Sequence, residues 1–227
     1  MTARTALVTG GGGGIGAAIC RGLATQGHRV AVADLAVEGA RRVAAEVDGV
    51  AVELDVTDPA SVAAAVAAAA EALGPIEICV NCAGWDELRP FLETDEAFQA
   101  KVLDINLAGP VRVTRAVLPA MVERSWGRII SIGSDAGRVG SSLESVYSGA
   151  KGGVIAFTKT IAREFARHGI TANTVCPGPT DTPLLDAITE ASADAERVIA
   201  GMTKAVPMRR LGQPDDVAPA VVFLASD

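Results

Sequence analysis

The stretch VTGGGGGIGAAI, residues 8–19, joins an apolar run to a helical segment through five consecutive glycines. In that context a glycine-rich loop brings backbone N–H groups and a helix N-terminus against a pyrophosphate. Two registers fit: G-x-G-x-x-G begins at Gly11, T-G-x-x-x-G-x-G has its first glycine at Gly10, and both end at Gly16. A flexible turn without a ligand is the alternative. Because a strand precedes the loop and a helix follows it, the stretch predicts a dinucleotide-binding loop.

Short apolar runs alternate with helical segments along the chain. Such alternation predicts parallel βαβ units. Because the runs are apolar throughout, we expect strands that are buried on both faces, in a sheet with helices on each side. The pattern predicts one α/β domain over residues 1–227, with a Rossmann-type doubly wound parallel sheet. The expected strands are residues 5–9, 29–34, 50–55, 76–81, 128–133 and 171–176.

Helix signals and prolines divide the remaining sequence. Asp58 and Pro59 are typical of the N-cap and first position of a helix, and Gly74 is typical of its end. The longest stretch without strand character runs over about 178–210, where three prolines interrupt the helical pattern. Long connections of this kind often carry function. We expect a substrate loop or lid there.

The chain is acidic, with a net charge of −7. Nucleic-acid binders display clustered Lys and Arg, so we expect small-molecule ligands and no nucleic-acid partner. No stretch approaches the roughly 20 apolar residues of a membrane span. The N-terminal residues lack the layout of a signal peptide, which favours a cytoplasmic location and no membrane partner.

Only one pair of cysteines, Cys79 and Cys82, is close in sequence, and the two histidines are far apart. C-x-x-C elsewhere indicates a redox or metal site. Here the pair lies on an expected strand, where odd spacing points side chains to opposite faces. We therefore expect no metal, and we interpret Cys79 as a core residue and Cys82 as a strand-end residue.

Asp34 ends the second expected strand, 18 positions after Gly16. A carboxylate there accepts hydrogen bonds from the adenosine ribose hydroxyls and repels a 2′-phosphate. No Arg occupies the glycine loop, so the local charge predicts NAD as the cofactor. An ordinary Asp in a turn after a strand is the alternative.

Tyr147 is the only tyrosine of the chain and precedes Lys151 by one helical turn in VYSGAK, residues 146–151. Residues i and i+4 share a helix face, so both polar tips can point into one cleft. Moving a phenol pKa from about 10 to about 7 requires roughly 4 kcal/mol, of which a nearby ammonium supplies part. The positive nicotinamide of NAD supplies more. The spacing predicts a base that takes an alcohol proton while hydride leaves for the cofactor.

The chain resembles the short-chain dehydrogenase/reductase family over its whole length, from TGGGGGIG through NCAG and SGAKGG to NTVCPGPTDT and RRLGQPDDVA. The resemblance implies a catalytic tetrad in the family's order and spacing. Ser134 would orient and polarise the substrate oxygen, and Asn106 would anchor a water that relays protons to Lys151. The tetrad is Asn106, Ser134, Tyr147 and Lys151.

The resemblance also implies where the cofactor lies. Its glycine register is the one that starts at Gly10, and the segment after Pro177 meets the nicotinamide, with Thr182 at the carboxamide. The family usually has a second Asn where this chain has Cys82. The residues implied to bind the cofactor are Gly10, Gly14, Ile15, Gly16, Asp34, Asp55, Val56, Asn81, Ala83, Gly84, Tyr147, Lys151, Pro177, Gly178 and Thr182.

The resemblance implies an NAD-dependent oxidoreductase that interconverts a secondary alcohol and a ketone, with a cyclic or linear β-hydroxyacyl-CoA as a candidate substrate. A 3-oxoacyl-thioester (acyl-carrier-protein) reductase is one alternative. A non-catalytic NAD-binding regulatory protein is another, which the intact tetrad disfavours.

Ligands of open α/β sheets bind beyond the carboxyl ends of the strands. We therefore expect the substrate between Trp85, residues 134–146 and residues 179–208. Trp85 and Leu143 would supply apolar surface, and Arg138 or Lys204 would meet the phosphates of a CoA.

The chain ends directly after an apolar helical stretch, PDDVAPAVVFLASD. The family that it resembles continues into another strand beside the sixth, which completes the sheet and contributes to a two-fold interface. We therefore expect a chain that lacks its last C-terminal strand and leaves residues 171–176 at an exposed edge. The resemblance also implies a homo-oligomer, a tetramer or dimer, formed through the helices around Asn106 and Tyr147.

Overall fold

The computed structural model describes residues 2–190 and 195–227. Its centre is a parallel six-stranded sheet with the order β3-β2-β1-β4-β5-β6. This is the doubly wound α/β arrangement that the apolar runs predicted, and each expected run carries a strand. The strands are β1 (Thr5–Thr9), β2 (Arg29–Asp34), β3 (Val50–Glu53), β4 (Ile78–Asn81), β5 (Gly127–Ile132) and β6 (Ile170–Val175).

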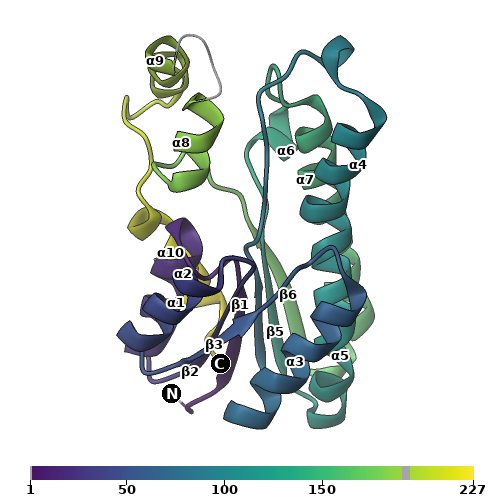
Figure 1. Cartoon of the computed structure of the whole chain (residues 1–227). Helices are drawn as coiled ribbons and strands as arrows, with labels where there is room; N and C mark the ends of the chain where they lie inside the picture. Colours follow the sequence, from purple (N-terminus) through teal and green to yellow (C-terminus); the bar gives the residue numbers. More distant parts are fainter. Residues whose placement is uncertain (1, 191–194) are drawn as a thin grey trace.

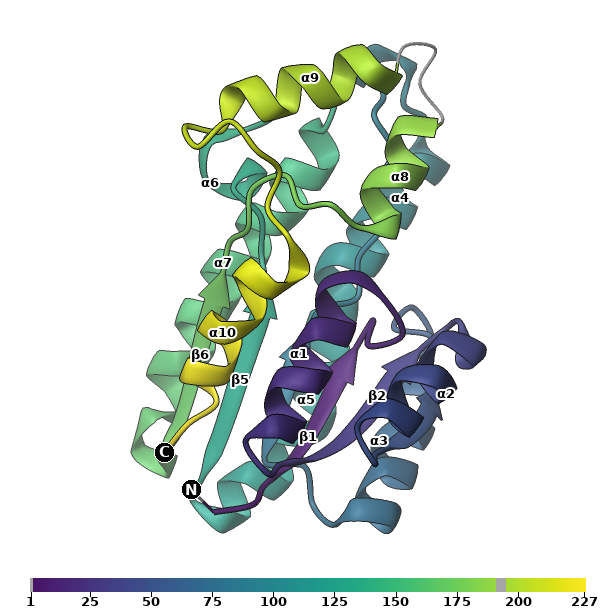
Figure 2. The same cartoon turned by 90° about the vertical axis from the view of Figure 1, so that its left-hand side faces the viewer.

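Helices cover both faces of the sheet (Figures 1 and 2). One hydrophobic core lies between the sheet and α1, α2 and α10, and a second lies between the sheet and α3, α5 and α7. Burial on both faces explains why the strand sequences are apolar throughout. These helices are α1 (Gly14–Thr25), α2 (Val37–Glu46), α3 (Pro59–Leu73), α5 (Gly109–Arg124), α7 (Ser145–Phe165) and α10 (Pro214–Leu224).

Helix α3 begins and ends as its sequence predicts. The Asp58 carboxylate accepts a hydrogen bond from the N–H of Ala60 at 2.9 Å, and Pro59 takes the first helical position. Gly74 ends the helix with a φ of 90°, a conformation that glycine adopts without strain.

The remaining helices lie beyond the carboxyl ends of the strands, at the top of Figure 1. Helices α8 and α9 stand together there in both views, on the side of the sheet that α1 covers. This end of the sheet therefore carries the extra structure. The helices are α4 (Glu96–Leu103), α6 (Ala136–Val139), α8 (Pro183–Glu190) and α9 (Ala195–Ala205).

Residues 178–210 were expected to form a loop in which prolines interrupt helix, and the structure corrects this detail. Pro183 begins α8, where a missing backbone N–H costs little, and Pro207 follows the end of α9. A parallel bridge between Thr180 and Gly212 brings the two ends of the segment together. Part of the expected lid, residues 191–194, lies outside the described residues.

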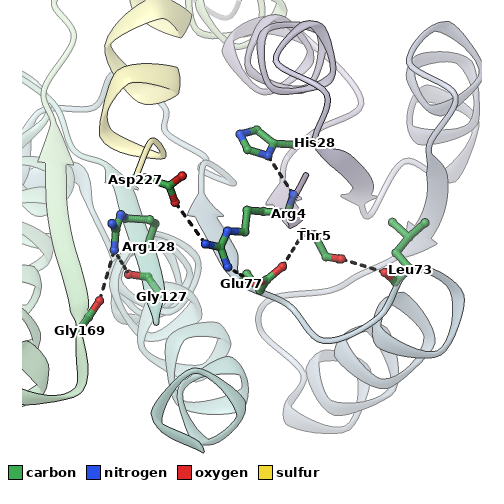
Figure 3. Close-up of polar contacts among 9 residues, drawn as sticks. All are labelled: Arg4, Thr5, His28, Leu73, Glu77, Gly127, Arg128, Gly169 and Asp227. Atoms are coloured by element: carbon green, nitrogen blue, oxygen red, sulfur yellow. Dashed lines mark hydrogen bonds and ion pairs between the residues drawn. The ribbon is translucent and has the colours of Figure 1, made fainter. Parts of the chain in front are cut away.

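Arg4 ties the amino ends of the strands together, at the opposite end of the sheet (Figure 3). Its guanidinium pairs with Glu77 at 2.6 Å and with Asp227 at 3.2 Å, and it stacks on Trp126 at 3.9 Å. These contacts join the start of β1 to the residues before β4 and β5 and to Asp227. These contacts stabilise the amino ends of the strands. They lie opposite the carboxyl ends, where open α/β sheets bind ligands.

Within the described ranges, β6 pairs only with β5 and forms one edge of the sheet. Cys79 belongs to one hydrophobic core and Cys82 packs against the other, so their side chains lie on opposite faces, as predicted. The part of the chain that the structure describes has no group of three or more His, Cys, Asp or Glu suited to a metal. None of its helices combines the length and the hydropathy of a membrane span.

Candidate active site

The backbone of the loop between β1 and α1 distinguishes the two glycine registers. Gly10 and Gly14 have φ angles of 65° and 51°, and a Cβ atom on Gly16 would overlap the carbonyl oxygen of Gly10. Gly13, in contrast, is extended, and a Cβ atom built there has no neighbour within 4 Å. The register that starts at Gly10 is therefore the one that requires glycine.

Helix α1 begins at Gly14 without a side-chain cap. The first N–H groups of a helix have no partner within the helix, so those of Gly14, Ile15 and Gly16 are available to a ligand. The helix dipole adds a partial positive charge at the same point. This loop therefore fits the pyrophosphate of a dinucleotide.

The loops that follow β1 and β4 meet at the centre of the sheet. The Thr9 hydroxyl accepts hydrogen bonds from the N–H groups of Cys82 at 3.0 Å and Ala83 at 3.1 Å. A Cβ atom on Gly10 would stand 2.9 Å from the Cα of Ala83. Since the chain leaves β1 and β4 toward opposite faces, this is the switch point at which open α/β sheets bind nucleotides.

Asp34 lies at the carboxyl end of β2, beside the glycine loop. Its Oδ2 accepts a hydrogen bond from the N–H of Gly12, and its Oδ1 accepts one from the N–H of Ala36, both at 2.9 Å. Arg42 of α2 donates a hydrogen bond to the carbonyl of Gly12 at 3.0 Å. Sequence reasoning missed Arg42, because only the folding of α2 against the loop brings it there. A carboxylate and a guanidinium therefore stand together at the expected ribose site.

Three of the residues implied to bind the cofactor are held by their own surroundings. Oδ1 of Asp55 accepts hydrogen bonds from the hydroxyl and the N–H of Thr57, at 2.6 and 2.8 Å, and these bonds lower the pKa of Asp55. Asn81 is buried and donates from Nδ2 to the Thr114 hydroxyl at 3.1 Å. Val56 is buried in a hydrophobic core. Asn81 is therefore fixed by a hydrogen bond, and Val56 is fixed by packing in the core.

Asn106 lies in a π-helical turn, Asp104–Ala108, and is fully buried. Its Nδ2 donates to the carbonyl of Trp85 at 2.6 Å, and its Oδ1 accepts from the Trp85 N–H at 3.3 Å. A Cβ atom on Gly84 would stand 3.1 Å from Oδ1 of Asn106 and 3.6 Å from Nζ of Lys151. Asn106 and Lys151 therefore border the same narrow space.

Tyr147 lies in the first turn of α7, and its hydroxyl is hydrogen bonded to the side chain of Ser134, which follows β5. Nζ of Lys151 lies 5.5 Å from the centre of the Tyr147 ring. Lys151 is buried, which lowers its pKa to about 8. A hydroxyl, a phenol and an amine thus converge beyond the end of β5, an arrangement suited to proton transfer at a substrate oxygen.

The pKa of Tyr147 differs from the sequence-based expectation. Burial raises it, the negative charges of Asp86 and Glu144 raise it further, and the hydrogen bond with Ser134 lowers it. The expectation counted the charge of Lys151 one helical turn away, whereas the carboxyl groups approach from separate loops. The chain by itself therefore keeps the phenol protonated at neutral pH.

The segment after β6 passes beside the glycine loop. A Cβ atom on Gly14 would stand 3.4 Å from the Cβ of Thr182. The carbonyl of Pro177 accepts a hydrogen bond from the N–H of Asp135 at 2.9 Å, and Gly178 has open space around it. Thr182, which was implied to contact the nicotinamide, therefore lies next to Gly14 of the loop that was implied to bind the pyrophosphate.

The side chains expected to line a substrate pocket are only partly available. The Trp85 ring packs edge to face on Phe98, with centroids 5.7 Å apart, and Nζ of Lys101 lies over it at 3.5 Å. Leu143 is exposed. Nη1 of Arg138 pairs with Oδ1 of Asp135 at 3.3 Å, and both side chains are exposed. Leu143 therefore offers free apolar surface, while Trp85 is already partly covered by α4.

Comparisons with known proteins identify the family to which the chain is related. Residues 4–193 match the family model described as short chain dehydrogenase. The chain is 41% identical to the oxidoreductase UcpA of Salmonella typhimurium, with 100% of this chain and 89% of the relative covered. It is 40% identical to the acetoacetyl-CoA reductase of Allochromatium vinosum, with 99% and 92% covered.

A solved structure, that of a variant of actinorhodin polyketide ketoreductase with NADPH, superposes with a TM-score of 0.93. It is 36% identical, and the match covers 99% of this chain and 90% of that one. The family model and these relatives identify an oxidoreductase. The chain belongs to the short-chain dehydrogenase family.

Proposed function

We propose that this chain is an NAD-dependent dehydrogenase that interconverts a secondary alcohol and a ketone, and that the alcohol is a cyclic or linear β-hydroxyacyl-CoA. The observation that supports this most is the convergence of Ser134, Tyr147 and Lys151 beside a glycine loop that fits a dinucleotide. A bound nicotinamide supplies or accepts the hydride.

The side chains have separate tasks in this reaction. Ser134 holds the substrate oxygen by a hydrogen bond, and Tyr147 donates a proton to that oxygen during ketone reduction. Burial and two carboxyl groups raise the pKa of Tyr147, so the proton is present at neutral pH. Lys151, whose pKa burial lowers to about 8, is able to return a proton to the site near neutral pH.

The choice of NAD rests on Asp34. Its carboxylate repels a 2′-phosphate and suits ribose hydroxyls. Arg42, which bonds to the same glycine as Asp34, acts in the opposite sense. We propose that the fixed carboxylate prevails, because both of its oxygens are held by backbone N–H groups whereas the Arg42 side chain is exposed.

The proposed substrate class draws on relatives. One relative is named an acetoacetyl-CoA reductase, and a similar structure is a polyketide ketoreductase. The stretches NCAGWDELRPF, SDAGRVGSSLESVY and CPGPTDTPLL also resemble 2-hydroxycyclohexanecarboxyl-CoA dehydrogenase, a name that none of the relatives reported above carries. A 3-oxoacyl-carrier-protein reductase and a non-catalytic NAD-binding regulator remain the competing hypotheses.

Three further properties belong to this proposal. Residues 178–210 act as a substrate lid, the protein works in the cytoplasm, and copies associate through the helices around Asn106 and Tyr147. Sedimentation of the purified protein checks the association, which a monomer would contradict.

A panel assay tests the function directly. NADH or NADPH oxidation is followed with acetoacetyl-CoA, a cyclic 2-oxoacyl-CoA, a 3-oxoacyl-carrier protein and simple ketones. The proposal predicts the highest kcat/KM for a CoA thioester with NADH. A preference for the carrier-protein substrate favours the first competitor, and cofactor binding without any turnover favours the second.

A further inference from the structure

Arg112 lies on α5 and joins two segments that are far apart in the sequence. Its Nη1 donates a hydrogen bond to the carbonyl of Val56 at 3.2 Å, and its Nη2 donates to Oδ1 of Asp104 at 2.6 Å. Val56 belongs to the loop after β3, whereas Asp104 begins the π-helical turn that carries Asn106. Arg112 therefore bridges this loop and this turn, and it belongs neither to the tetrad nor to the residues implied to bind the cofactor.

The π-helical turn uses two groups of Asp104. Its carbonyl accepts a hydrogen bond from the N–H of Gly109, five residues later, and its carboxylate accepts the bond from Arg112. The side chains of this ion pair are only partly exposed. Turns of this kind are rare and occur frequently at functional sites. The position of Asn106, in the middle of the turn, is therefore tied to Arg112.

The end of the π-helical turn also packs directly on the loop after β3. A Cβ atom on Gly109 would stand 2.9 Å from the Cβ and Cγ2 atoms of Val56, which is buried. The bond from Arg112 fastens the loop to α5 at the same residue. Because closely packed segments transmit strain, a change in the loop reaches the turn.

The loop after β3 lies where the adenine of a dinucleotide would reach. The glycine loop follows β1, Asp34 ends β2, and the N–H of Leu54 donates to the carbonyl of Asp34 at 3.0 Å. In the strand order β3-β2-β1, a dinucleotide with its pyrophosphate at the glycine loop and its ribose at Asp34 extends toward β3. The adenine then meets Asp55 and Val56, the residues implied to contact it.

We propose that Arg112 is a positioning residue that couples the adenine site to Asn106. The inference rests on the proposed function, because it requires a bound dinucleotide. An adenine that orders the loop after β3 also orders the π-helical turn through Arg112. Asn106 and Lys151, which border one narrow space, are then held in place for proton transfer. Binding at one end of the dinucleotide thus prepares the site at its other end.

Amide hydrogen exchange, followed by mass spectrometry, tests the coupling without turnover. The probe is AMP, which carries the adenine, the ribose and one phosphate but no nicotinamide. In the parent, saturating AMP should slow the exchange of residues 55–58 and, by about fivefold or more, that of residues 104–108. In Arg112→Met, AMP should still slow the exchange of residues 55–58 but lose most of its effect on residues 104–108.

Two variants of Asp104 keep the test decisive if Arg112→Met does not fold. Asp104→Ala removes only one end of the bridge and should also remove most of the effect of AMP on residues 104–108. Asp104→Asn, whose Oδ1 still accepts the hydrogen bond, should retain most of it. Arg115→Met replaces an exposed arginine of the same helix and is the matched control, which should behave as the parent does.

Equal slowing at residues 104–108 in the parent and in Arg112→Met overturns the inference, and so does a parent that binds AMP without any slowing there. Loss of the AMP effect at both segments of Arg112→Met also overturns it, because Arg112 would then only build the adenine site. With saturating NADH, kcat of Arg112→Met should fall about 2- to 30-fold, and an unchanged kcat overturns the inference as well. If the parent binds neither AMP nor NADH, the proposed function itself fails.

Discussion

Nζ of Lys151 donates a hydrogen bond to the carbonyl oxygen of Ile132 at 2.9 Å, which ties the buried amine of α7 to the last residue of β5. Burial lowers the pKa of this amine to about 8. The folded protein therefore disfavours the charged form. The cost is fully present below the folded pKa and disappears as the pH rises past the ordinary lysine value of about 10.4.

We compare the free energy of unfolding of Lys151→Met with that of the parent. We predict that the difference, variant minus parent, is roughly 2–3 kcal/mol larger at about pH 7 than at about pH 10.5. Urea unfolding of both proteins at the two pH values gives this double difference. An equal stability difference at both pH values would show that the amine is not perturbed by folding. Lys159→Met, at an exposed position of the same helix, is the control.

The glycine loop provides a second matched pair. Gly16→Ala forces a Cβ atom onto the carbonyl of Gly10, whereas a Cβ atom at Gly13 meets nothing within 4 Å. Overpacking typically costs about 1–3 kcal/mol, so Gly16→Ala should lower the free energy of unfolding by that amount and weaken dinucleotide binding. The free energy of unfolding of Gly13→Ala should lie within about 0.5 kcal/mol of the parent value. Equal unfolding curves for the two variants would refute this account of the loop.

The cofactor preference depends on Asp34 and Arg42. Asp34→Asn removes the charge that repels a 2′-phosphate, so we expect the Kd for NADPH to fall about 10-fold relative to that for NADH. Adding Arg42→Gln should reverse much of this gain, because the guanidinium is the neighbouring cation. Cofactor fluorescence titrations measure both effects without turnover. A parent that already binds NADPH as tightly as NADH contradicts the assignment to Asp34.

Asp86 also affects stability as the pH changes. Its folded pKa is raised by burial and by Glu144, so its destabilising effect is absent below the ordinary Asp range and grows as the pH rises toward the folded pKa. Asp86→Asn should therefore stabilise the protein relative to the parent at slightly alkaline pH and lose this advantage near pH 4. Thermal unfolding at both ends of this range checks the sign, and a larger advantage at acid pH would contradict it.

The sequence predicted what depends on local pattern. The six strands follow from continuous apolar runs, and the start of α3 follows from Asp58 and Pro59. The sequence left two glycine registers possible. Only the φ angles and the close approach of Gly16 to Gly10 distinguish the register that starts at Gly10 from the one that starts at Gly11. Pairings between distant segments were missed, since no spacing rule links Asp86 to Glu144 or Arg42 to Gly12.

The prolines of residues 178–210 also show that a local sequence pattern does not by itself determine the structure around it. Proline signals the boundary of a helix, but whether it begins a helix or breaks one depends on the backbone around it. Pro183 begins α8 and α9 follows, so the described part of a segment expected to be irregular is largely helical. The role of this segment as a substrate lid is a separate proposal.

The central claim is that the Tyr147 hydroxyl donates the proton at the substrate oxygen, and Tyr147→Phe tests it most directly because it removes that one atom. The measurement is kcat for ketone reduction, with cofactor Kd and melting temperature recorded on the same preparation. General acid catalysis typically contributes about 10²- to 10⁴-fold, so we predict a loss of that size in kcat, with cofactor affinity and stability close to those of the parent. Turnover within a fewfold of the parent in a folded, cofactor-binding Tyr147→Phe protein would contradict the account.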